Sequence, residues 1–72
     1  MKNNNNNTNK LNLHRGDFVH IKFNKNINKM CTFYEYDKKQ KHYLFKDNNG
    51  FFELSENYIN NSNIILEIMP GL

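Results

Sequence analysis

Basic and aromatic side chains alternate through the middle of the chain, and their chemistry suits an anionic partner that carries rings. A lysine ammonium group can neutralise a phosphate, and an exposed phenol ring can stack on an unpaired nucleobase. Both types are dense between residues 34 and 43. We therefore predict a binding surface made of six residues: Tyr34, Tyr36, Lys38, Lys39, Lys41 and Tyr43.

The spacing of the remaining reactive side chains does not support catalysis or metal binding. Structural zinc sites place pairs of ligands a few residues apart, whereas the candidate ligands here are separated by 6, 11 and 11 residues: His14, His20, Cys31 and His42. The three glycines are too far apart to form a phosphate loop, and no Ser or Thr lies in a nucleophile motif. We expect no enzymatic activity, no cofactor and no metal.

Two-residue alternation of apolar and polar side chains predicts strands along most of the chain. It is clearest in residues 18–23, where Val19, Ile21 and Phe23 share one face. No stretch shows helical periodicity over ten residues. Four further strands are predicted, at 30–36, 42–46, 51–54 and 64–69.

Turn signals separate the predicted strands. Asn49-Gly50 lies between two apolar runs and predicts a type I′ hairpin turn, because both residues tolerate positive φ. A charged turn is expected at 37–41, and Ser55 is expected to cap one helical or 3₁₀ turn over 55–58. The fold predicted is all-β: a five-stranded antiparallel small barrel with a short 3₁₀ turn before the last strand.

The sequence pattern does not decide which face of the second predicted strand points into the core. If Cys31 and Phe33 point inward, then Thr32, Tyr34 and Tyr36 point outward. In the opposite register the two tyrosines belong to the core and Phe33 is exposed. In both cases strict alternation keeps the tyrosines together and leaves at least one large ring near the surface, where exposed aromatic side chains often mark an interface.

Residues 16–68 present their elements in an order that is typical of small barrels: Gly16-Asp17-Phe18-Val19 opening the first strand, a polar loop at 24–29, hairpins at 37–41 and 47–50, and a turn at 55–58. This order resembles the SH3-like or Tudor-like barrels, although the second strand has no glycine at Met30-Cys31-Thr32. It also resembles the Sm-like fold, which implies RNA binding and a ring of subunits, although the chain lacks a clear N-terminal helix.

Charge and composition divide the 72-residue chain. Residues 1–46 carry ten Lys or Arg and three acids, whereas residues 47–72 carry four acids and no Lys or Arg. Residues 1–12 are Asn-rich and polar, which predicts a disordered tail before a domain at 13–72. No secretory signal is recognisable, and no apolar run approaches the ~20 residues of a membrane span. We therefore expect a cytoplasmic location without membrane contact.

These patterns favour a non-enzymatic binding module. The expected partner is RNA, single-stranded DNA or a nucleoprotein complex, and an unpaired edge strand could join copies into a homo-oligomer. The small size and the AT-biased composition, with 16 Asn, suggest an alternative. In that alternative the chain is a phage or mobile-element accessory protein that inhibits a host enzyme, such as a CRISPR nuclease, by protein–protein binding. Its acidic segment 47–67 would then imitate phosphate.

Overall fold

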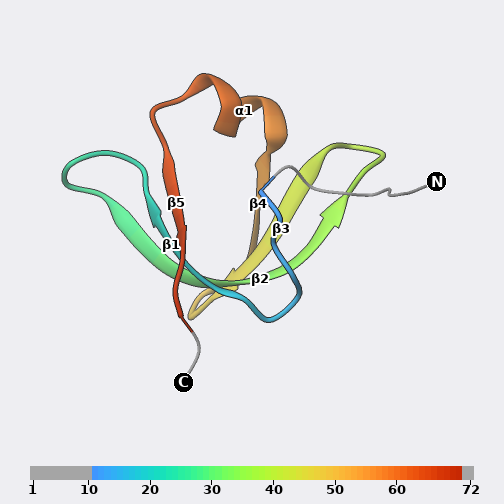
Figure 1. The fold of residues 1–72 in the computed structure, drawn as a ribbon, viewed down its shortest axis with the longest axis horizontal. Coiled ribbons are helices and arrows are strands. Elements are labelled where there is room, and N and C mark those ends of the chain that lie inside the picture. The colour runs from blue at the N-terminus through green and yellow to red at the C-terminus, as the bar shows by residue number, and fades with distance from the viewer. Residues whose placement is uncertain (1–10, 71–72) are drawn as a thin grey trace.

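A computed structural model describes residues 11–70 and shows a mostly β chain built around one long, curved strand. That strand bends across the base of the molecule, and the single helix lies over the concave side of the sheet (Figure 1). The elements are β1 (Phe18–Lys22), β2 (Asn28–Asp37), β3 (His42–Asp47), β4 (Gly50–Ser55), α1 (Glu56–Asn61) and β5 (Ile65–Ile68).

The five strands form one antiparallel sheet in the order β4-β3-β2-β1-β5. The first four strands follow one another as a meander, and β5 returns to the free side of β1. Each strand lies within two residues of its predicted bounds, so the prediction of a five-stranded antiparallel fold is confirmed. Closure into a barrel is not confirmed, because β4 and β5 end the sheet and do not pair with each other within residues 11–70.

A β-bulge in β2 decides which of its side chains are buried. Phe33 pairs with Phe45, but the next pair joins Glu35 to Leu44, so Tyr34 is an extra residue. Phe33 is therefore buried while Tyr34 and Glu35 are both exposed. The register with Cys31 and Phe33 inward and Tyr34 outward is therefore confirmed up to the bulge. It is wrong at Tyr36, which packs on the core side, and the opposite register is wrong for Phe33 and Tyr34.

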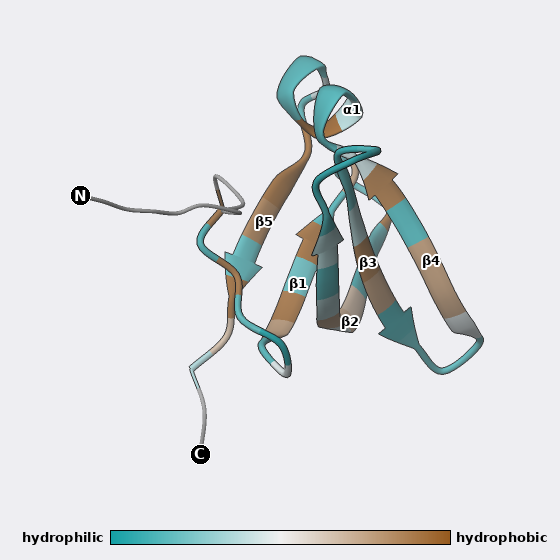
Figure 2. Cartoon of the chain, turned by 90° about the vertical axis from the view of Figure 1, so that its right-hand side faces the viewer, coloured by the Kyte–Doolittle hydropathy of each residue, from teal (hydrophilic) through white to brown (hydrophobic). Residues whose placement is uncertain are grey.

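The core lies on the concave side of the sheet, beneath α1. Its largest fully buried side chains are Tyr43 and Phe45, and the ring of Phe33 packs edge-on against Phe45 with centroids 5.7 Å apart. Apolar and polar positions alternate along β1, as bands of opposite colour in Figure 2 show. Leu13 and Ile59 are also buried, so the segment before β1 and the helix each contribute one side chain to the core.

The β3–β4 hairpin lies where the sequence predicts it but uses a different turn. Asp47 pairs with Gly50, which makes Asn48 and Asn49 the two loop residues. Neither asparagine has positive φ, so the turn is not type I′; the positive φ, +124°, belongs to Gly50. The Asp47 carboxylate accepts a hydrogen bond from the Asn49 amide (2.8 Å), two residues later in the chain, and this bond stabilises the turn.

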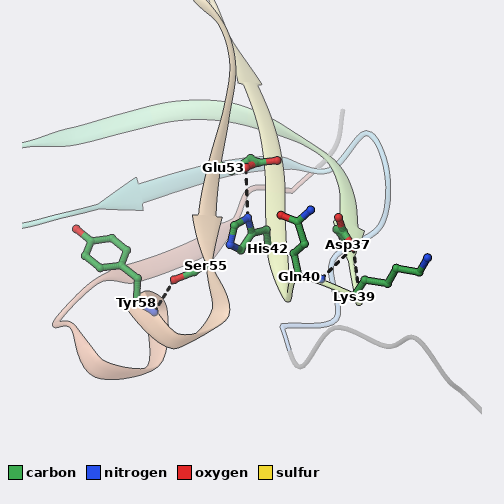
Figure 3. Close-up of polar contacts among 7 residues, drawn as sticks. All are labelled: Asp37, Lys39, Gln40, His42, Glu53, Ser55 and Tyr58. Atoms are coloured by element: carbon green, nitrogen blue, oxygen red, sulfur yellow. Dashed lines mark hydrogen bonds and ion pairs between the residues drawn. The ribbon is translucent and has the colours of Figure 1, made fainter.

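The β2–β3 turn is held in a similar way, by Asp37. Its carboxylate accepts hydrogen bonds from the amides of Lys39 (2.9 Å) and Gln40 (3.2 Å), as Figure 3 shows. Lys41 then takes a left-handed φ of 59°. Its carbonyl accepts a hydrogen bond from the Glu56 amide (2.8 Å), so this strained residue connects the turn to the start of α1.

The segment predicted as a 3₁₀ turn is instead a six-residue α-helix. Ser55 caps it as expected, because its hydroxyl accepts a hydrogen bond from the Tyr58 amide (2.9 Å; Figure 3). At the same end of the helix, the Tyr36 hydroxyl donates to the Glu56 carboxylate (2.6 Å). This hydrogen bond is the main cause that raises the pKa of Tyr36 to about 12.

The predicted tail at 1–12 lies outside the described residues except for Leu11 and Asn12. Within the described residues, no helix has the length and hydropathy that crossing a membrane would require.

We expect Lys41→Gly to stabilise the protein by about 1 kcal/mol or less. An L-residue in the left-handed region costs about 1–2 kcal/mol, and the greater unfolded-state entropy of glycine offsets part of the gain. Lys39→Gly in the same turn is the matched control and should destabilise, because Lys39 does not have positive φ. Urea unfolding at pH 7 measures both; equal destabilisation by the two variants would contradict this account of the turn.

We expect Tyr36→Phe to lower the free energy of unfolding by about 1 kcal/mol at pH 7, since it removes a partly solvated hydrogen bond to a carboxylate. The folded-state pKa of Tyr36 lies above the ordinary value of 10. Its contribution is therefore complete below pH 10 and is lost as the pH rises towards 12. The difference in unfolding free energy between wild type and Tyr36→Phe should shrink over that interval. Tyr58→Phe removes an exposed hydroxyl from α1 and is the matched control; it should change the free energy of unfolding at pH 7 less than Tyr36→Phe does.

Candidate binding surface

The outer, convex face of the sheet carries large apolar side chains that the core does not use. Phe18 is 49% exposed, Met30 42%, Tyr34 38% and Phe51 54%. Two cationic side chains lie among them. We call this set the aromatic–cation face; it consists of Arg15, Phe18, Met30, Tyr34, Lys46 and Phe51.

Strand register aligns part of this face in one row. Phe18 of β1 lies opposite Thr32 of β2, Thr32 lies opposite Lys46 of β3, and Lys46 lies opposite Phe51 of β4. Directly paired residues share a face of the sheet, and neighbouring strands are about 4.8 Å apart. The two phenylalanines therefore lie about 14 Å apart, with a hydroxyl and an ammonium group between them.

Tyr34 joins this row because it is the bulge residue of β2. Its ring meets that of Phe51 edge-on, with centroids 5.1 Å apart. The Arg15 guanidinium lies 4.3 Å from the centroid of the Tyr34 ring, and it also forms an ion pair with Glu35 (3.3 Å). The Tyr34 ring thus contacts two groups of the aromatic–cation face, the Phe51 ring edge-on and the Arg15 guanidinium over its centroid.

Backbone contacts hold Arg15 in this position. The Gly16 amide donates to the Phe33 carbonyl (2.9 Å), and the Phe33 amide donates to the Asp17 carbonyl (2.8 Å). Gly16 has a φ of +95°, which other residues rarely adopt. The segment before β1 is thereby fastened to β2 beside the bulge, so the guanidinium can reach the exposed ring of Tyr34.

Lys46 supplies the second cation. Its Nζ lies 5.5 Å from the Phe51 ring centroid, within the range of a cation–π contact. Within residues 11–70, Lys46 forms no ion pair with a carboxylate. Its charge therefore remains available to an anionic partner.

A hollow of about 280 Å³ adjoins the row at the β3–β4 turn. Its lining combines two apolar side chains of the aromatic–cation face with polar groups from β2, β3 and the turn. The lining residues are Phe18, Met30, Cys31, Thr32, Lys46, Asp47 and Asn48.

The structure separates the six residues predicted to form the binding surface. Tyr34 lies on the aromatic–cation face. Tyr43 is 1% exposed and belongs to the core, and Tyr36 packs against it on the concave side with ring centroids 4.7 Å apart. The three lysines lie at or next to the β2–β3 turn: Lys38, Lys39 and Lys41.

Sequence reasoning missed most of the aromatic–cation face. Two signals were available: Phe18 shares the polar face of its alternating strand, and adjacent strand residues such as Phe51 and Phe52 must point to opposite faces. No sequence signal indicated that Arg15 would lie over Tyr34, because that contact depends on the Gly16–Phe33 hydrogen bond.

A second hollow, of about 540 Å³, lies between the β1–β2 loop and the start of β5. Its lining includes Phe23, which also packs against the core, and two lysines. Lys22 is 3.6 Å from the Glu67 carboxylate, which leaves Lys25 as the cation without an ion pair within the described residues. This hollow has no exposed ring with a cation beside it and is the weaker candidate.

Other reactive side chains are engaged in local contacts. Burial is the main cause that raises the pKa of Cys31 to about 11, so the thiol is protonated at neutral pH and is a poor nucleophile. Each histidine lies within 4 Å of one carboxylate; the His42–Glu53 contact (3.3 Å) is visible in Figure 3. In the part of the chain that the structure describes, no three His, Cys, Asp or Glu side chains are grouped to hold a metal ion.

Protein-family models, curated proteins and solved structures were compared with this chain, and none of them matches it.

Proposed function

We propose that this chain is a non-enzymatic binding module that contacts single-stranded nucleic acid, RNA or DNA, through its aromatic–cation face. The observation that carries the proposal is the row Phe18–Thr32–Lys46–Phe51, in which register alone places two exposed rings on either side of a cation that forms no ion pair with a described carboxylate. A nucleic-acid strand presents a similar sequence of groups, with planar bases joined by phosphates.

Stacking and charge neutralisation would contribute separately to such binding. A base that stacks on an aromatic side chain gains about 1–3 kcal/mol, whatever the base. Lys46 would neutralise a phosphate, and the release of counterions makes that part of the affinity depend on salt; the Arg15 charge is already paired with Glu35. Arg15 also presents a planar guanidinium, and bases stack on such planes as well as on rings.

The geometry favours single strands over a duplex. Bases in a duplex stack on one another, so their faces are not accessible to rings on a sheet surface. Within residues 11–70, the aromatic–cation face is the outside of a sheet, and the helix α1 lies over the opposite, concave side, so no described helix is placed to enter a major groove from this face. Unpaired bases can instead lie across it from strand to strand.

The proposal extends to architecture and assembly. The strand order, together with a short helix before β5, supports an opened relative of the SH3-like barrels. Because β4 and β5 are the end strands of the sheet, one of them could pair with a second copy, as in the subunit ring that the Sm-like alternative implies.

A second candidate function is inhibition of a host enzyme by protein–protein binding. The supporting observation is that aromatic, Met and Arg side chains, which interface cores favour, occur together on the aromatic–cation face. Imitation of phosphate by the acidic segment receives less support. Each of its four carboxylates has a partner among the described residues: Asp47 with Lys29, Glu53 with His42, Glu56 with Tyr36, and Glu67 with Lys22.

Alanine substitution of the rings tests the stacking contribution. We expect Phe18→Ala and Phe51→Ala each to weaken binding of a fluorescein-labelled ten-nucleotide single strand about five- to 150-fold, the equivalent of about 1–3 kcal/mol. Tyr58→Ala removes an exposed ring from α1 and is the matched control. Fluorescence anisotropy measures the affinity. Wild-type protein that binds neither RNA nor DNA, but forms a complex with a nucleoprotein enzyme, would favour the inhibitor function instead.

Charge reversal distinguishes the aromatic–cation face from the β2–β3 turn. Lys46→Glu should weaken single-strand binding. It should also reduce the slope of log affinity against log salt concentration by about one, the contribution of one phosphate contact. Lys25→Glu, in the β1–β2 loop, controls for net charge. The triple variant Lys38→Glu, Lys39→Glu and Lys41→Glu tests the surface predicted from sequence. If that variant abolishes binding while Lys46→Glu has no effect, the turn and not the face is the binding surface.

A further inference from the structure

We propose that β5 pairs as an antiparallel strand with β5 of a second copy of this chain, with Leu66 of one copy opposite Leu66 of the other. β5 is one end of the sheet and β4 is the other, as Figure 2 shows. An apolar strand at a sheet edge presents backbone groups with which a further strand can pair. This inference deepens the assembly that the proposed function includes, because it names the strand, the register and the partner.

One hydrogen bond fixes which backbone groups of β5 are free. The Met69 amide donates to the Phe18 carbonyl (2.8 Å), so the backbone groups of Met69 point towards β1. In an antiparallel sheet, successive residues point their backbone groups to alternate sides of the strand. Ile65 and Glu67 therefore point towards β1 as well. The other two residues of β5 point away from the sheet, on the side where no strand pairs with β5 within residues 11–70: Leu66 and Ile68.

The flanking residues limit this free edge to three positions. Ile64 directly precedes β5 and is, by the same alternation, the first outward position. Pro70 is the next outward position after Ile68, and it has no amide hydrogen to donate. The free edge thus extends from Ile64 to Ile68 and has Leu66 at its centre. It carries exposed apolar surface, since Ile68 is 48% exposed.

The other end strand is less suited to pairing with its own copy. The Glu56 amide donates to the Lys41 carbonyl (2.8 Å), so the backbone groups of Glu56 point towards β3. By the same alternation, three residues of β4 point outward: Phe51, Glu53 and Ser55. A full overlap of β4 with its copy therefore centres on Glu53 and places two carboxylates directly opposite each other, which destabilises the pair.

Antiparallel pairing of β4 with β5 of another copy fails for a different reason. Directly paired residues share one face of a sheet. The outward positions of β4 carry side chains of the outer face, as Phe51 does, whereas those of β5 carry side chains of the concave face, because Leu66 pairs with the buried Ile21 of β1. Such a pairing would join the outer face of one copy to the concave face of the next. Self-pairing of β5 keeps each face continuous.

The register centred on Leu66 also gives the most favourable cross-strand neighbours. Ile64 of each copy lies opposite Ile68 of the other, and each of the three pairs exchanges two backbone hydrogen bonds, about six in all. The concave side gains contacts between aliphatic side chains, and on the outer side Glu67 lies opposite Ile65 of the second copy. A shift of the second copy by two residues would place the two Glu67 carboxylates opposite each other, which is unfavourable.

Self-pairing places both aromatic–cation faces on the same side of one continuous sheet. Phe18 lies opposite Met69, three residues beyond Leu66, and β1 is the strand next to β5. The two Phe18 residues are therefore about 14 Å apart across the strands and about 20 Å apart along them, or about 25 Å in total. A nucleic-acid strand long enough to cover this distance contacts both faces, and two linked contacts bind more tightly than one.

Sedimentation equilibrium of the chain alone, from about 10 to 500 µM, tests self-pairing without nucleic acid. Wild type should dimerise. Ile68→Lys should weaken the dimer at least about tenfold, because it sets a charge opposite Ile64 at two places in each dimer. Ile65→Lys is the matched control: it adds the same charge at a similarly exposed residue, but opposite Glu67, and should keep the dimer affinity. Urea unfolding at low protein concentration checks that both variants fold.

Cysteine substitution tests the register. Leu66→Cys should form an intermolecular disulfide under mild oxidation, because the Cα atoms of a hydrogen-bonded pair lie about 5.5 Å apart, within the range that a disulfide spans. Glu67→Cys is the comparison, since only the shifted register places this residue opposite its own copy. The native Cys31 is buried and should not cross-link. Non-reducing electrophoresis measures the dimer, and faster cross-linking of Glu67→Cys than of Leu66→Cys contradicts the register.

The outcomes separate this inference from the proposed function. A monomeric wild type, or a dimer that Ile68→Lys and Ile65→Lys weaken equally, overturns self-pairing of β5, and single-strand binding by the monomer still stands. A dimer that responds to the variants as expected but binds no single strand overturns the proposed function alone. If both hold, the affinity ratio between thirty- and ten-nucleotide probes, measured by fluorescence anisotropy, should be at least about tenfold lower in Ile68→Lys than in Ile65→Lys.

Discussion

Side chains on a β-strand alternate between two faces, and the bulge at Tyr34 is the point where this chain departs from that rule. Under strict alternation, Phe33 and Tyr36 would lie on opposite faces and the concave side would lose one of the two rings. The extra residue allows both rings to pack against Tyr43, while Tyr34 and Glu35 are exposed. The composition of the core and the place of Tyr34 on the outer face both depend on this one residue.

Large aromatic side chains lie on both faces of this small sheet, although only the concave face forms the core. The concave side is filled by Phe33, Tyr43 and Phe45 together with aliphatic side chains. Phe18 and Phe51 nevertheless occupy outward positions, where polar residues would avoid the cost of hydrating apolar surface. Phe51 lies beside Lys46, and Phe18 lines the same hollow as Lys46. The proposed function therefore depends on side chains that the core does not use.

Antiparallel pairing redistributes the charge that is segregated along the sequence. The basic first part of the chain supplies β1 and β2, and the acidic last part supplies β4 and β5, but the strand order places the two acidic strands at opposite edges of the sheet with the basic strands between them. Lys22 of β1 thus meets Glu67 of β5, and Lys29 of β2 reaches Asp47 of β3. The asymmetry of the sequence is partly cancelled in space. Of the three lysines that lie within described strands, Lys22, Lys29 and Lys46, only Lys46 forms no ion pair with a described carboxylate.

Local patterns in the sequence determined the strands, the positions of the hairpins and the Ser55 helix cap, because alternation, turn propensity and capping act over a few residues. Only the tertiary structure decided which tyrosines are buried, because a one-residue bulge resets every later side chain of β2. The same holds for the aromatic–cation face and the hollow, whose residues are brought together by pairing between strands that are distant in sequence. That pairing depends on long-range register, which alternation within a single strand does not specify.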